Sequence, residues 1–302
     1  MTTYSVVGKP VTRQEGPDKV SGKFLYSADV VLPGMIWGKV LRSPYSHARI
    51  ISIDASRAMA LPGVHAVITG QDTAGMRVGR MVRDVPLLAE DKVRFAGERV
   101  AAVAADDPDI AEEALLLIDV EYEPLPAVYD PIEAMDPGSP EVHEGSPTFD
   151  TYSGTVQPQG NILNHSTWSN GDVEQGFLES DLIFEHTFTT TWVHQGYMEP
   201  YACVVHIDDA GRIQVWANNK VPYTLRKQLA GAIGVPEDKV LVNPCGIGGD
   251  FGGKSPAMNV PLALAANVFF SLSLIPDQMF APCSLRCLAT EMSSEFRAPS
   301  KA

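Results

Sequence analysis

Positive charge is missing from the middle of this 302-residue chain. No Lys or Arg occurs between Arg99 and Arg212, whereas that stretch holds 22 Asp and Glu. The whole chain carries a net charge of −14 from 23 basic and 37 acidic residues. A protein with this balance repels phosphate backbones, which argues against general nucleic-acid binding. The acidic stretch is typical of a solubilising face, and an acidic docking surface for a basic partner is the sharper alternative.

Cysteine is also scarce, with four residues in the chain, which excludes a disulfide scaffold. The N-terminus has no basic segment followed by an apolar core, so the sequence predicts no secretory signal and favours the cytoplasm. Residues 255–276 contain no charged side chain and are long enough to span a bilayer. Because Pro, Asn and Ser interrupt them, we expect a buried helix over 256–266 and no membrane association.

Apolar residues make up 45 % of the chain, enough to offset the entropy of ordering a packed globular protein. The 25 Gly and 23 Pro indicate many turns and argue against a plain helical bundle. Apolar periodicity predicts helices at 55–61, from 108 and at 222–233, and strands at 38–42, 49–53, 64–68, 99–104, 119–123, 182–192, 202–207, 212–217 and 239–242. The order of strand, helix and strand over 99–123 suggests a βαβ unit, although that order alone does not prove a parallel pair.

Proline and glycine concentrate in residues 124–165, which reads as linker. The sequence therefore predicts a first domain over 1–145, a linker over 146–165 and a second domain over 166–266. Residues 267–302 show no consistent hydrophobic period and are expected to be a divergent, poorly ordered tail.

Five glycines fall within eight positions directly after the last predicted strand, in the run CGIGGDFGGKS. Such a loop exposes backbone N–H groups and suits a phosphate or oxyanion ligand. By letter, residues 248–255 match the P-loop pattern GxxxxGKS, which makes a nucleotide binder one alternative. No apolar strand ending in Asp follows to hold magnesium, and a ligand-free turn is a further alternative.

Several stretches of the sequence, taken in order, help to choose among these alternatives. They are DKVSGKFLYSADVVLPGMIWGKVLRSPYSHARIISID, LPGVHAVITGQD, DKVRFAGERVAAVAAD, AEEALLLIDVEYEPLPAV, GDVEQGF, HQGYMEP, GRIQVWA and GIGGDFGGK. Together they resemble the molybdenum hydroxylases, the family of xanthine dehydrogenase and aldehyde oxidase, over roughly residues 8–266. The resemblance implies an α+β fold, with an a/b hammerhead domain followed by the beginning of a molybdopterin-binding domain, and reduces the P-loop to a minor alternative.

The resemblance also implies an activity and a site. Such enzymes hydroxylate a carbon of an aldehyde or N-heterocycle with oxygen from water, and electrons leave through molybdenum to iron–sulfur centres and flavin. The cofactor-binding residues that it implies here are Gln195, Gly248, Gly249, Phe251, Gly252 and Gly253. Gln195 would hydrogen-bond the metal's oxo group, and Phe251 would shape the substrate pocket. Asp250 stands where relatives often have glycine and is expected to alter substrate preference. No protein ligand to the metal and no catalytic residue is assigned.

The implied cofactor is molybdenum–molybdopterin in its cytosine dinucleotide form, and the implied partners are iron–sulfur and FAD-binding subunits. The family's molybdenum subunit is much longer and carries its catalytic glutamate in a part that has no match here. We therefore expect a truncated subunit, or one half of a split gene with a separately encoded second half, that lacks molybdenum and activity when isolated. The alternative is a non-catalytic remnant that serves as a folded binding fragment.

Overall fold

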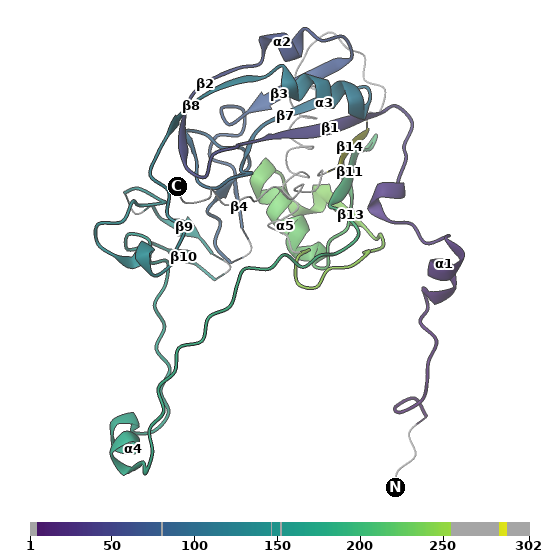
Figure 1. Cartoon of the computed structure of the whole chain (residues 1–302). Coiled ribbons are helices and arrows are strands. Elements are labelled where there is room, and N and C mark those ends of the chain that lie inside the picture. Colours follow the sequence, from purple (N-terminus) through teal and green to yellow (C-terminus); the bar gives the residue numbers. More distant parts are fainter. Residues whose placement is uncertain (1–4, 80, 146, 152, 255–283, 289–302) are drawn as a thin grey trace.

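The computed structural model describes residues 5–79, 81–145, 147–151, 153–254 and 284–288 (Figure 1). Its largest element is a seven-stranded mixed sheet. In spatial order the strands are β13 (Val240–Asn243), β12 (Ile213–Ala217), β11 (Ala202–Ile207), β14 (Ser284–Leu288), β1 (Met35–Arg42), β7 (Arg99–Ala105) and β3 (Val64–Thr69). The first three strands and the last three come from opposite halves of the chain, so one sheet unites both predicted domains.

Smaller sheets and five helices complete the described part. A three-stranded sheet has the order β6 (Lys92–Val93), β2 (Ala48–Asp54) and β8 (Asp119–Pro124), and two ribbons pair β4 (Arg77–Val78) with β5 (Val85–Pro86) and β9 (Phe149–Asp150) with β10 (Thr155–Val156). The helices are α1 (Gly16–Ser21), α2 (Ser56–Met59), α3 (Pro108–Leu116), α4 (Val173–Glu179) and α5 (Pro222–Ile233), with short 3-10 turns at Ser27–Asp29, Glu133–Met135 and Glu237–Lys239. This mixture of helix and strand is the α+β class that the sequence predicts.

Strand β14 joins the two halves of the large sheet. It runs parallel to β1 and antiparallel to β11. Residues 284–288 belong to the stretch expected to be a divergent tail, so these five residues have a place in the sheet that the sequence pattern did not predict. The rest of that stretch, and the helix expected over 256–266, lie outside the described residues. Within the part that is described, no helix is long and apolar enough to cross a membrane.

One hydrophobic core is shared by both halves of the chain. Ile36, Ile68 and Leu87 from the first half form a single buried cluster with Val205 and Leu225 from the second. Helix α5 covers this face of the sheet, beginning at a proline and ending at a glycine in the left-handed conformation, with the bounds that the sequence predicts. Burying these side chains together favours one cooperative unit. The domain boundaries drawn from composition remain a prediction.

Strand β7 is buried on both faces, which explains its continuous apolar sequence. Its second face packs against α3, where Ala111 and Ala114 meet Val103. Asp107 caps this helix by accepting hydrogen bonds from the amides of Asp109 (2.9 Å) and Ile110 (2.8 Å). The predicted strand and helix are therefore confirmed.

The suggested βαβ unit is wrong. After α3 the chain enters β8, which pairs antiparallel with β2 in the three-stranded sheet and has no hydrogen bonds to β7. Side chains of β8 alternate between exposed and half-buried, so only one face of this strand is covered. A strand covered on one face need not lie in the central sheet, where β7 is buried on both faces.

The strand expected over 182–192 is also wrong. This segment belongs to a long extended arm that leaves the body of the molecule and carries α4 (Figure 1). Its β-branched and aromatic residues favour a strand, but no strand of the described residues pairs with it. Large apolar side chains on the arm are exposed, among them Leu182, Phe184, Phe188 and Trp192.

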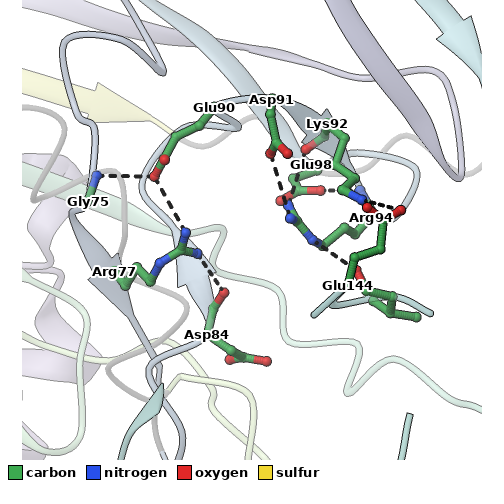
Figure 2. A network of polar contacts seen from close by, with 10 residues as sticks. Gly75, Arg77, Asp84, Glu90, Asp91, Lys92, Arg94, Glu98 and Glu144 are labelled. Carbon is green, nitrogen blue, oxygen red and sulfur yellow. Dashed lines mark hydrogen bonds and ion pairs between the residues drawn. The ribbon is translucent and has the colours of Figure 1, made fainter. Parts of the chain in front are cut away.

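Val142 and Glu144 of the proline-rich stretch are held by polar contacts to residues 92–94 (Figure 2). The Lys92 ammonium pairs with Glu144 at 2.9 Å, and the guanidinium of Arg94 donates to the carbonyl of Val142 at 3.2 Å. The same network includes Glu98, a residue that is only 2 % exposed. Its carboxylate accepts a hydrogen bond from the backbone N–H of Arg94.

We expect Glu98→Gln to stabilise the protein at neutral pH. Burial raises the pKa of Glu98 above its ordinary 4.5, so the folded state binds this proton more tightly than the unfolded state does. Stability is therefore lost as the pH rises from about 4.5 through the folded-state pKa. The urea midpoint of Glu98→Gln should exceed that of the unchanged protein at pH 7 and match it near pH 4. The exposed Glu113→Gln is the control, and a lower midpoint for Glu98→Gln at pH 7 would contradict the expectation.

Candidate functional site

The glycine-rich loop follows β13 and is held at its start by the N-terminal segment. The Gly246 N–H donates to the carbonyl of Leu25 at 2.8 Å, and Gly246 forms an isolated parallel bridge with Tyr26. A Cβ atom at position 246 would lie 2.3 Å from the ring of Phe24. Only glycine allows this approach, so the sequence places a glycine where two backbones meet.

The other support of the loop is the segment 194–201, which contains the run HQGYMEP. The Glu199 carboxylate accepts the Gly248 N–H at 2.6 Å, and the Glu199 N–H donates to the Gly248 carbonyl at 3.3 Å. The same carboxylate pairs with the ammonium of Lys254, whose side chain is fully buried and lies 4.9 Å from the centre of the Tyr197 ring. A buried charge needs such a partner, and this pair ties both ends of the loop to one residue.

Two tyrosines enclose the end of the loop. The Tyr201 hydroxyl donates to the carbonyl of Gly253, and burial, followed by the neighbouring Tyr197, raises the pKa of Tyr201, which keeps it a neutral donor. A Cβ atom at Gly253 would lie 2.6 Å from the Tyr197 ring and 3.1 Å from Oε1 of Gln195. The structure therefore brings Gln195 beside the glycine loop, and its expected hydrogen bond to the metal's oxo group stays a prediction.

The predicted glycines occupy different environments. Gly249 and Gly252 have φ of +104° and +94°, values that side chains rarely adopt. Apart from Gly252 itself and its two chain neighbours, no atom of the described residues lies within 4 Å of a Cβ placed on Gly252, so the space beside it is open. A Cβ placed on Gly248 would instead lie 2.7 Å from the Cβ of Glu199. The loop thus has a crowded side against 194–201 and an open side at Gly252.

Phe251 lies at the tip of the loop, 75 % exposed. Its ring is therefore not a hydrophobic anchor for the loop within the described residues, and it faces outward. Beside it, the Asp250 carboxylate accepts hydrogen bonds from Lys220 and from amides of its own loop. The carboxylate is thus engaged within the protein, and its expected effect on substrate preference stays a prediction.

Cys245 and Lys254 have chemistry that limits their roles. Burial raises the pKa of the Cys245 thiol to about 11, with the Glu199 charge adding to the effect, and the thiol donates to the Ala217 carbonyl at 2.8 Å. The thiol is therefore protonated at neutral pH, which makes it a poor nucleophile. The buried pairing of Lys254 with Glu199 keeps its ammonium from a phosphate, which argues against the P-loop alternative. No group of three His, Cys, Asp or Glu side chains that could hold a metal occurs in the described ranges.

Sequence reasoning missed both ion pairs of the loop. It did not foresee the pairing of Glu199 with Lys254. Nor did it foresee the ion pair of Asp250 with Lys220, at 2.8 Å. The partners are 55 and 30 residues apart in sequence, so no local spacing signals either contact.

Comparison with known proteins finds two family models in the order expected from the motifs. Residues 21–126 match the a/b hammerhead domain of aldehyde oxidase and xanthine dehydrogenase, and residues 156–270 match the molybdopterin cofactor-binding domain. The chain is 39 % identical over 260 residues to a probable xanthine dehydrogenase subunit of Bacillus subtilis, covering 85 % of this chain and 33 % of that protein. It is 35 % identical to the nicotinate dehydrogenase large molybdopterin subunit of Eubacterium barkeri, covering 83 % of this chain and 56 % of that one.

Solved structures give the same result. Quinoline 2-oxidoreductase from Pseudomonas putida 86 superposes with a TM-score of 0.77 and 30 % identity, over 94 % of this chain and 34 % of that one. A Cu,Mo-CO dehydrogenase superposes equally well, at 33 % identity. The chain thus spans between about a third and just over half of the length of these relatives.

Proposed function

Since the chain belongs to the molybdenum hydroxylase family of xanthine dehydrogenase and aldehyde oxidase, as a portion of its molybdopterin-binding large subunit, we propose that it forms one wall of the cofactor site in such an oxidoreductase. The observation that carries this proposal is the meeting of the glycine loop with Gln195 at Gly253. Two segments far apart in sequence, both expected to hold the cofactor, lie side by side. The reaction proposed is hydroxylation of an aldehyde or N-heterocycle carbon.

The residues present fit a group rich in hydrogen-bond donors and acceptors. Oε1 of Glu199 is buried and has no hydrogen-bond donor among the described residues, so it is available to an N–H group such as a pterin carries. The open side of Gly252 leaves room for a ligand to approach the backbone. An unsatisfied acceptor on one side of the loop and open space on the other are both compatible with a polar cofactor.

When bound, molybdenum–molybdopterin supplies the redox chemistry of the reaction. The residues of this chain bind and orient it. The amide of Gln195 offers both a donor and an acceptor at the edge of the loop. The Glu199–Lys254 ion pair keeps the loop in place. Phe251 offers an apolar ring at the open side, where it can exclude water from a substrate and stack on an aromatic one.

The wider assembly is part of the proposal. Both curated relatives are subunits by name, one of them a large subunit, which indicates complexes of several chains. We propose iron–sulfur and FAD-binding subunits as partners because electrons removed from the substrate need a path out of the site. The cytosine dinucleotide form of the cofactor and a location in the cytoplasm complete the proposal. Cytidine monophosphate released by acid from a purified complex would identify the nucleotide.

Gly252→Val tests this role. We expect a complex of this chain, co-produced with a polypeptide that supplies the remaining length of the relatives, to contain molybdenum and pterin. Valine at position 252 should lower both at least tenfold, because its side chain enters the open side of the loop and strains a backbone at φ +94°. The measurements are metal analysis and pterin fluorescence after oxidation.

Gly97→Val is the matched control. Gly97 has φ +87° and likewise has nothing within 4 Å of its Cβ direction, but it lies in the first half of the chain next to Glu98. Valine at position 97 therefore causes the same kind of backbone strain, but away from the glycine-rich loop. Equal metal loss in both variants would assign the effect to stability, and an unaltered metal content in Gly252→Val would refute the proposed site.

A further inference from the structure

Phe251 has a backbone conformation that needs an explanation. Its φ is +45°, and it is the sole non-glycine residue with positive φ among those described. An L-residue with a bulky side chain adopts this left-handed region at a cost, and such strain persists only where the surroundings impose it. The ring is 75 % exposed, so packing of the side chain does not impose it.

Asp250, the residue before Phe251, forms hydrogen bonds to the residues that follow Phe251 and to Lys220. One carboxylate oxygen of Asp250 accepts from the Lys220 ammonium at 2.8 Å and from the Gly252 N–H at 3.3 Å, and the other accepts from the Lys254 N–H. The backbone carbonyl of Asp250 accepts the Gly253 N–H at 2.7 Å. The residue before Phe251 therefore binds three consecutive amides after it, which closes a tight turn with Phe251 at its tip.

Lys220 connects this turn to the frame of the molecule. It lies three residues after the end of β12, and Asn218, two residues before it, is fully buried, with its side-chain amide donating to the carbonyl of Pro200 at 2.7 Å. The Lys220 ammonium thus comes from a fixed position. Partial desolvation alone would raise the pKa of Asp250, but its hydrogen bonds hold that pKa below the ordinary 3.8, so the carboxylate is ionised at neutral pH.

We propose that Asp250 and Lys220 form a clasp that holds Phe251 in the left-handed conformation and presents its ring at the open side of the loop. Asp250 is then a positioning residue, and it acts through Phe251. The role of the ring toward a cofactor or substrate rests on the proposed function. The clasp itself involves only residues of this chain and does not depend on that function. The clasp also occupies the amides of Gly252 and Lys254, which removes them from the donors that a cofactor can use.

Hydrogen exchange tests the clasp without any cofactor. Asp250→Ala should speed exchange of the Gly252 and Lys254 amides about tenfold or more, since each loses a hydrogen bond to a charged group. Lys220→Met leaves the carboxylate in place and should give a smaller increase. Asp208→Asn is the matched control, because Asp208 binds the amides of Ala210 and Arg212 in a surface hairpin turn. It should alter exchange in that turn only.

A double-mutant cycle tests the strain. Phe251→Gly relieves the strain of the left-handed backbone conformation, and this gain exists only while the clasp enforces that conformation. Its effect on the unfolding equilibrium constant, measured by urea, should therefore be more favourable in the unchanged background than in Asp250→Ala, by about fivefold or more. A merely structural Asp250 would give equal effects in both backgrounds.

The outcomes separate the clasp from the proposed function. Unchanged exchange at Gly252 and Lys254 in Asp250→Ala, or a cycle that closes within twofold, would overturn the clasp whatever the metal content of the complex. Faster exchange and a coupled cycle, together with a complex that never takes up molybdenum, would support the clasp and refute the proposed function.

Discussion

Lys254→Met should destabilise the protein by about 3–5 kcal/mol, because it leaves the Glu199 carboxylate buried without a counter-charge. The Lys254 side chain is fully buried and that of Glu199 is 11 % exposed, so water replaces little of the lost interaction. The loop amide of Gly248, bound to the same carboxylate, should lose protection with it. Urea unfolding followed by circular dichroism measures the change.

A second substitution distinguishes the charge from the packing. Adding Glu199→Gln to Lys254→Met removes the buried charge and keeps an acceptor for Gly248, so at least half of the lost stability should return. Arg57→Met is the control, since its ion pair with Asp119 is exposed on both sides and should change stability by about 1 kcal/mol or less. A double variant as unstable as Lys254→Met would assign the loss to packing alone.

Leu225→Ala should cost about 2–5 kcal/mol, because Leu225 is 1 % exposed in the core shared by both halves of the chain. Since the two halves bury one cluster together, the loss should appear in each of them. Native-state hydrogen exchange should show an equal fall in protection in β7, from the first half, and in β12, from the second.

This measurement also tests whether the first half folds independently, as the composition of residues 124–165 predicts. Protection that falls in β12 and remains unchanged in β7 would show an autonomous first domain and contradict the shared unit. Leu116→Ala, on α3 and 81 % exposed, is the control and should change stability little in either half.

Local patterns in the sequence predicted elements whose cause is local. Asp107 and Pro108 begin α3, and a proline and Gly234 bound α5, because capping and φ preferences depend on neighbouring residues. The strands predicted at 202–207 and 212–217 form for the same reason, as the hairpin of β11 and β12 with Gly211 at φ +71° in its turn. In the candidate site, the run of glycines identified the loop, and the resemblance named Gln195 as a cofactor-binding candidate, whereas the closeness of Gln195 to Gly253 came from the structure.

Pairing across long sequence distances was decided only by the tertiary structure. The apolar residues of 182–192 favour a strand, yet a strand forms only where another offers its backbone, and none in the described part does. β8 shares no sheet with β7 because its backbone pairs with β2, and its half-buried residues Val120 and Tyr122 pack on a separate cluster that includes Ala48 and Val93. The union of both halves in one sheet depends on β14, whose five residues carry no distinctive period.

By itself, the sequence determined the α+β class, the family and the position of the glycine loop, since each depends on residue types at fixed local spacing. The tertiary structure alone decided how that loop is held. Lys254 lies 55 residues from Glu199, and Asp250 lies 30 from Lys220. The position of a charged side chain in the sequence does not tell which opposite charge it will pair with. It is paired by whatever opposite charge the packed backbone brings within a few ångströms, because burial makes an unpaired charge too costly to retain.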